Sequence, residues 1–170
     1  KDVLKFEGLK KAGIIKNLLA ALALQLGQEV SYQELATMLG INRLTVQKYI
    51  DVLEQSFVIF KLNAFARNKR KEISKSIKVY FYDIGIRNSL VENFNNLEIR
   101  ADTGALWENF CIVERKKMNE DKSRFVNSYF WRTYDQKEID YIEEAGGEIN
   151  GYEFRWSDKK SYKPPVDFTE

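Results

Sequence analysis

Apolar residues recur at three- and four-residue spacing through the first third of the chain, which is the period of an amphipathic helix. The first such segment covers residues 12–28. Its apolar positions are Ile15, Leu18, Leu19, Leu22 and Leu26. Two further helical segments follow at residues 32–39 and 43–55. The pattern therefore predicts three helices around one core.

The second and third of these helices have clear start and stop signals. Ser31 precedes Glu34 by three residues, which is the capping-box spacing, and Gly40 is placed to end that helix. Asn42 can cap the next helix. The apolar side of that helix then holds Val46, Ile50 and Leu53. Two short helices joined by such a turn predict a helix-turn-helix.

The start of the third helix is polar on its outward side. The residues there are Asn42, Arg43, Thr45, Gln47 and Lys48. In a helix-turn-helix, the start of the second helix meets base edges and phosphates in the major groove. We therefore predict DNA binding. A protein partner is the alternative, because Asp51 and Glu54 on the same helix temper its basic character.

Two segments rich in aromatic and β-branched residues, 57–62 and 77–82, are predicted to pair as a hairpin. The stretch between them is basic. Its cationic residues are Arg67, Lys69, Arg70, Lys71 and Lys75. Beside a helix-turn-helix, such a hairpin tip is typical of a wing that contacts the DNA backbone. A solvated loop is the alternative.

Residues 83–170 read as a second, smaller domain. A helical or turn-like segment at 84–93 precedes a helix at 104–117, in which Leu106, Phe110 and Val113 share a face. Strands are predicted at 128–133, 137–143 and 149–156. The overall class is therefore α+β, with a winged helix-turn-helix domain at 1–82 and an α/β domain at 83–170.

Charge separates the same two halves. Residues 1–80 carry 14 Lys and Arg against 7 Asp and Glu, whereas residues 81–170 carry 13 against 18. This asymmetry suggests two modules with different partners. One cysteine and no histidine exclude an internal disulfide, zinc fingers and histidine-based catalysis. Without a leader or an apolar stretch long enough to span a bilayer, we expect a cytoplasmic protein that does not enter a membrane.

Carboxylates in the second half form a candidate catalytic group. Asp140 and Glu153 lie in adjacent predicted strands, and Arg155 is two residues beyond Glu153, on the same face. Glu108, on the preceding helix, can approach from the side. Acids that hold Mg²⁺ beside a basic residue suit phosphodiester hydrolysis. The alternative is that these acids have no catalytic role and belong to the polar side of a half-exposed sheet, in which acidic and apolar residues alternate along each strand.

Five segments, in this order, resemble the C-terminal region that follows the ATPase module in a large group of prokaryotic AAA-type ATPases. The phrase KVYFYDIGIRNSL and the pairing of WRT with EIDYI are the specific ones. The resemblance covers residues 31–156 and implies that the chain is a segment of a longer protein. The segments are SYQELATMLGINRLTVQKYIDVLEQSFVIFKL, KSIKVYFYDIGIRNSL, TGALWENFCIVE, YFWRTYDQKEIDYI and GYEFRW.

The resemblance implies a winged helix that leads into a restriction-endonuclease-like domain of the PD-(D/E)XK fold, truncated here at its C-terminus. Glu108 then matches the acidic residue of the first helix, Asp140 the metal-binding aspartate and Glu153 the acid of the E-x-K signature, so Asp140 and Glu153 are the implied metal ligands. The chain departs from the pattern at Arg155, where the family usually has lysine. Arginine stays protonated near neutral pH and cannot act as a general base.

Three functions follow as expectations. The first is a non-catalytic DNA-binding and coupling region that works with the N-terminal ATPase module of its parent chain. It needs no cofactor, because the sequence has no phosphate-cradling G-x-x-x-x-G-K-[ST] loop and should neither bind nor hydrolyse ATP. The second is a Mg²⁺-dependent nuclease that uses the three acids. The third is a module that binds another protein.

Overall fold

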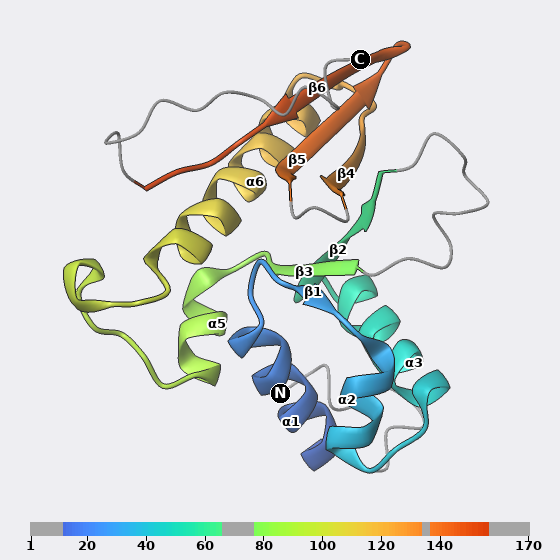
Figure 1. Ribbon diagram of the computed structural model, residues 1–170, viewed down its shortest axis with the longest axis vertical. Coiled ribbons are helices and arrows are strands. Elements are labelled where there is room, and N and C mark those ends of the chain that lie inside the picture. The colour runs from blue at the N-terminus through green and yellow to red at the C-terminus, as the bar shows by residue number, and fades with distance from the viewer. Residues whose placement is uncertain (1–11, 66–76, 134–136, 157–170) are drawn as a thin grey trace. The chain divides into compact units, whose positions relative to one another are not determined.

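The computed structural model of the 170-residue chain describes residues 12–65, 77–133 and 137–156 (Figure 1). The chain forms two compact units. The first holds residues 1–61 and 76–96, and the second holds residues 62–75 and 97–170. No helix in the described part of the chain is both long and apolar enough to cross a membrane.

The first unit contains the three helices expected from the periodicity. α1 covers Ala12–Leu24, α2 covers Tyr32–Leu39 and α3 covers Arg43–Gln55. The bounds of α2 and α3 confirm the prediction. α1 ends at Leu24 rather than at residue 28, because the chain turns there and Gly27 takes a φ of 73°. The prediction was wrong for those last residues.

The caps of α2 and α3 form as the sequence indicates. Ser31 Oγ accepts a hydrogen bond from the Glu34 amide at 3.3 Å, and Gly40 ends α2 in the left-handed region with a φ of 63°. Asn42 Oδ1 accepts from both the backbone amide and the hydroxyl of Thr45, at 2.8 and 2.9 Å. These contacts satisfy amide groups that a helix start otherwise leaves unpaired.

The core of the first unit is formed by the apolar sides of these helices and by strands packed on them. β1 covers Glu29–Val30, β2 covers Ile59–Ala64 and β3 covers Ile77–Phe81. β3 lies between β1 and β2, so the predicted pairing of the two longer strands is present. Buried side chains of this unit include Ile15, Leu18, Leu22, Leu35, Val46, Ile50, Leu53, Ile59 and Val79.

β2 starts two residues later than its composition suggests, because Phe57 belongs to the end of α3. Its φ is 54°, a left-handed value that is rare for an aromatic residue. The Phe57 amide donates to the Glu54 carbonyl at 3.0 Å, and the Val58 amide donates to the Leu53 carbonyl at 3.1 Å. This arrangement closes a helix C-terminus and delays the extended conformation.

α5 (Ile84–Leu90) belongs to the first unit, so the division of the chain does not fall between residues 82 and 83. The Asp83 carboxylate caps α5 by accepting from the Ile86 amide at 3.0 Å. Arg87, which is 4% exposed, donates from Nε to the Ala23 carbonyl of α1 at 2.9 Å. This buried contact joins α5 to the helices, and the unit therefore extends to residue 96.

The second unit combines one long helix with antiparallel strands. A 3₁₀ turn at Leu97–Ile99 precedes α6 (Thr103–Asp121). The strands are β4 (Asn127–Arg132), β5 (Glu138–Ala145) and β6 (Glu148–Tyr152). β5 pairs antiparallel with both β4 and β6, and the last residues of β2 pair in parallel with β4. The described strands follow the order β1-β3-β2-β4-β5-β6, so the α+β class is confirmed.

The buried face of α6 differs from the expected one. Leu106 and Val113 are buried as predicted, but Phe110 is 45% exposed. Its place in the core is taken by the neighbouring Asn109 and Ile112, which are both fully buried. Phe110 instead stacks on Trp107 with ring centroids 5.6 Å apart. The helical spacing of Leu106, Phe110 and Val113 predicted the buried face of α6. In the structure, this face is turned about the helix axis toward Ile112.

Candidate nucleic-acid interface and carboxylate pair

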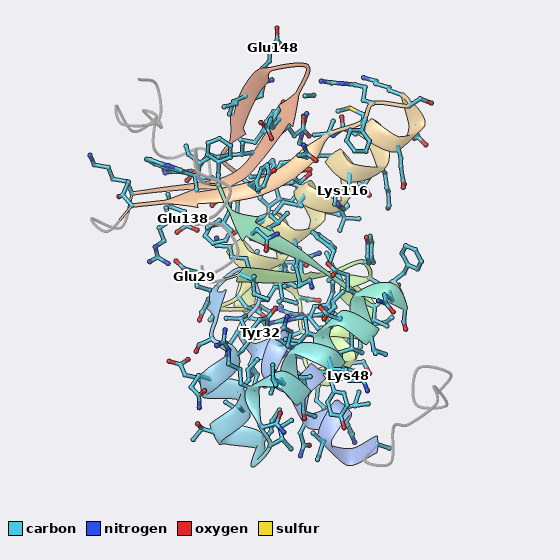
Figure 2. All side chains as sticks on the ribbon, turned by 90° about the vertical axis from the view of Figure 1, so that its right-hand side faces the viewer. Glu29, Tyr32, Lys48, Lys116, Glu138 and Glu148 are labelled. Carbon is cyan, nitrogen blue, oxygen red and sulfur yellow. The ribbon has the colours of Figure 1, made fainter. Side chains whose placement is uncertain are left out.

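The start of α3 has one polar, exposed side and one apolar, buried side. Asn42, Arg43, Gln47 and Lys48 are exposed, while Thr45 is half-buried. Lys48 lies on α3 in Figure 2. The opposite side holds Val46, Ile50 and Leu53, each no more than 1% exposed. The helix therefore presents the side chains that the sequence analysis selected.

Two of the selected residues also serve the helix itself. The Asn42 carboxamide oxygen and the Thr45 hydroxyl are hydrogen-bonded to each other in the cap. Of the five residues, Arg43, Gln47 and Lys48 are the long side chains on this exposed side. Arg43 and Gln47 are four residues apart and are therefore neighbours on the helix surface, and Lys48 follows Gln47 directly.

The acidic residues further along α3 are bound by a lysine from β2. Lys61 Nζ lies 2.7 Å from Asp51 Oδ1 and 2.9 Å from Glu54 Oε2. Burial alone would lower the pKa of Lys61, but hydrogen bonds with the two carboxylates outweigh burial and raise that pKa above its usual value. The positive charge of Lys61 thus compensates the carboxylates, which weaken the field of Arg43 and Lys48 less than the sequence suggested.

The basic residues predicted for the wing cannot be added to this surface from the structure. They lie outside the described residues, and their contact with DNA stays a prediction. They are Arg67, Lys69, Arg70, Lys71 and Lys75.

In the second unit, the structure brings Asp140 and Glu153 together. Tyr141 of β5 pairs with Tyr152 of β6, so Asp140 and Glu153 are the next opposite positions of that ladder. Opposite residues of an antiparallel pair lie on one face. The Asp140 Oδ2 atom accepts a hydrogen bond from the Phe154 amide at 2.8 Å, which fixes the chain just after β6.

The environment of Glu153 favours its neutral form. Burial, and after it the nearby charge of Asp140, raise the pKa of Glu153 above its usual value, while Arg155 opposes the shift. Arg155 lies 3.3 Å from Glu153 Oε1. The other oxygen, Oε2, is buried and has no hydrogen-bond partner among the described residues. In the structure, Arg155 therefore pairs with one of the two predicted acids.

Asp140 and Glu153 are the two carboxylates of the predicted group that the structure brings together. Within residues 12–65, 77–133 and 137–156, no three acidic or cysteine side chains are arranged to hold a metal ion. Glu108 on α6 is half-buried and does not complete such a group. Mg²⁺ is commonly held by one or two carboxylates together with water, so the metal-ligand role of Asp140 and Glu153 stays a prediction.

Sequence reasoning missed the most strongly bonded group of the second unit. Glu143 of β5 is 1% exposed, and the Arg115 guanidinium donates to both its oxygens at 2.9 and 2.8 Å. Asn119 Nδ2 donates to the same carboxylate at 2.7 Å, and Arg115 lies over the Tyr152 ring at 3.7 Å from its centroid. The sequence held a signal, because Glu143 is two residues beyond the buried Tyr141 and so lies on the same face of β5.

The chain is similar to uncharacterized proteins of three bacteria. One from Mycobacterium tuberculosis and one from Mycobacterium bovis are each 29% identical over 131 residues, which is 76% of this chain and 29% of the relative. One from Haemophilus influenzae is 24% identical over 155 residues, which is 87% of this chain and 35% of the relative. The chain thus spans about a third of the length of these curated relatives.

No solved structure matches the chain. Residues 103–170 match the family model described as a domain of unknown function, DUF4143. Residues 1–98, more than half of the chain, match a second model of that kind, and the chain therefore belongs to the family described as a domain of unknown function, DUF8612.

Proposed function

We propose that this chain binds double-stranded DNA through the start of α3 and couples that binding to an AAA-type ATPase module of its parent protein. The chain itself contributes no ATPase site and no catalysis. In this proposal the first unit is the DNA-binding domain of winged-helix type, and the second unit is a restriction-endonuclease-like scaffold that has lost its activity. The proposed location is the cytoplasm, where such a motor meets DNA.

One observation carries the DNA-binding part. Arg43, Gln47 and Lys48 are exposed on the first two turns of α3, and the side of the same helix that faces the core is fully apolar. A helix start with cations and an amide side chain suits both phosphate contacts and base edges. Lys61 pairs with Asp51 and Glu54, so these two carboxylates repel the phosphates of DNA less than the sequence alone suggests.

The coupling to an ATPase module is supported by the resemblance of the chain and by the length of its relatives. Residues 31–156 resemble the region that follows the ATPase module in AAA-type ATPases, and residues 103–170 match the domain of unknown function DUF4143. The curated relatives are about three times as long as the region they share with this chain, which leaves room for a motor module. The chain itself has no phosphate-binding loop motif. Any nucleotide-driven work then belongs to other parts of the parent protein.

A protein partner is the second candidate, and exposed apolar side chains favour it. Leu44 on α3 is 76% exposed and Met38 on α2 is 62% exposed. Side chains of this kind are common at protein contacts, although single exposed apolar residues are also ordinary on surfaces. We do not propose the nuclease function, because Arg155 cannot act as a general base and pairs with Glu153.

The salt dependence of duplex binding tests the proposal. If Arg43 and Lys48 each neutralise one phosphate, Arg43→Ala and Lys48→Ala should each weaken binding and reduce the slope of log affinity against log salt by about 0.9. Fluorescence anisotropy of a labelled duplex, titrated at several salt concentrations, measures both quantities.

The matched control is Lys117→Ala, which removes an exposed lysine of α6 that pairs with Glu114 at 2.7 Å. Its affinity and slope should equal those of the unaltered chain. If the slope of log affinity against log salt is the same in Arg43→Ala, Lys48→Ala and the unaltered chain, the assignment of DNA binding to α3 is contradicted. A chain that binds no duplex at any salt concentration would favour the protein-partner function.

A further inference from the structure

An apolar side chain lies in the middle of the polar face of α3. Leu44 is the second residue of the helix and is 76% exposed. The cap formed by Asn42 and Thr45 fixes the first turn, and Val46, two residues on, is completely buried. A residue two positions from the buried Val46 points away from the core. Leu44 therefore projects outward from the surface that we propose meets DNA.

The neighbours of Leu44 define what it can contact. Gln47 and Lys48 are three and four residues further along the helix, so their side chains flank Leu44 on the same face. Further along, the face ends at Asp51, whose carboxylate is bound by Lys61 at 2.7 Å. The exposed surface is thus short: a leucine and a glutamine side by side, with Arg43 and Lys48 beside them.

This combination matches one feature of the major groove. The C5-methyl group of thymine is the apolar group that a normal base presents there, and leucine is suited to contact it. Glutamine can pair with N6 and N7 of adenine. An A·T-rich duplex offers both groups at neighbouring positions. The flanking cations favour a polyanion over an apolar protein surface as the occupant.

We infer that Leu44 contacts thymine methyl groups, so that α3 prefers duplex DNA containing A·T pairs over duplexes without the methyl group. This inference rests on the proposed function, because it names the base chemistry read by the same helix. It assigns the leucine to specificity and leaves the salt-dependent affinity to Arg43 and Lys48.

The test uses two duplexes that differ only in the methyl group. One is a short duplex of alternating adenine and thymine, and the other replaces every thymine with uracil. We expect the unaltered chain to bind the thymine duplex about three- to five-fold more tightly, the value expected when one methyl group is removed from water. Leu44→Ala should bind both duplexes equally, with the affinity that the unaltered chain has for the uracil duplex.

Leu24→Ala is the matched control, since Leu24 ends α1 and is 69% exposed. It should keep the preference for thymine. The inference is overturned if the unaltered chain binds both duplexes equally, or if Leu44→Ala keeps the preference; salt-dependent binding in either case leaves the proposed function standing. If neither duplex is bound at low salt, the proposed function fails and the inference fails with it.

Discussion

Replacing Arg115 with methionine is expected to lower the free energy of unfolding of the second unit by about 3 kcal/mol at neutral pH. The substitution leaves the Glu143 carboxylate 1% exposed, without the guanidinium that now donates to both its oxygens. Asn119 still donates to it, which keeps the loss at the lower end for a broken buried pair. All three tryptophans belong to this unit, so urea titration followed by tryptophan fluorescence reports its unfolding.

The effect of Arg115→Met should depend on pH. Burial alone would raise the pKa of Glu143, but hydrogen bonds from Arg115 and Asn119 outweigh burial and hold that pKa below its usual value. A lowered pKa in the folded state gives a stabilisation that is fully present above the unfolded pKa, about 4.3, and is lost as pH falls through the folded value. The difference between variant and parent should therefore narrow below about pH 4.

The control for this prediction is Lys117→Met on the same helix. Lys117 pairs with Glu114 across an exposed surface, and such pairs contribute little to stability. We expect no measurable change in its urea midpoint. Equal losses in Arg115→Met and Lys117→Met, or a loss that does not change with pH, would contradict the role given to the buried pair.

Replacing Ile50 with alanine should destabilise the first unit by about 2–5 kcal/mol, which is the usual cost of truncating a fully buried aliphatic side chain. Ile50 is 0% exposed and lies on the core side of α3. Leu44→Ala, on the exposed side of the same helix, should change stability by less than about 0.5 kcal/mol. Urea titration followed by circular dichroism of the helices measures both.

The comparison of Ile50→Ala with Leu44→Ala tests which side of α3 faces the core. Similar losses for the two variants, or a larger loss for Leu44→Ala, would mean that the helix is rotated relative to the structure. The polar face would then be buried, and the DNA-binding proposal would lose its basis.

Local signals predicted the first unit well. Ser31, Gly40 and Asn42 act within one helical turn of their own position, so their roles can be read from neighbouring residues. The burial of α3 likewise follows from a spacing of three and four residues. The turn at Phe57 could not be predicted this way, because an aromatic residue carries no preference for its left-handed φ of 54°.

The candidate sites show the same limit. The approach of Asp140 to Glu153 follows from a short hairpin and strand parity, and both could be read from the chain. The partners of Glu143 could not, because Arg115 lies 28 residues away on another element and only the packing of α6 on the sheet brings them together. The exposure of Phe110 also depends on that packing rather than on helical period.

The most direct measurement is the NMR footprint of DNA on the chain. Amide signals are assigned and followed while a short duplex is added at low salt. The account predicts that shifts concentrate on residues 43–48 at the start of α3, with the buried Ile50 and the Glu143 group of the second unit unchanged. Shifts that concentrate on the second unit, with residues 43–48 unaffected, would contradict it.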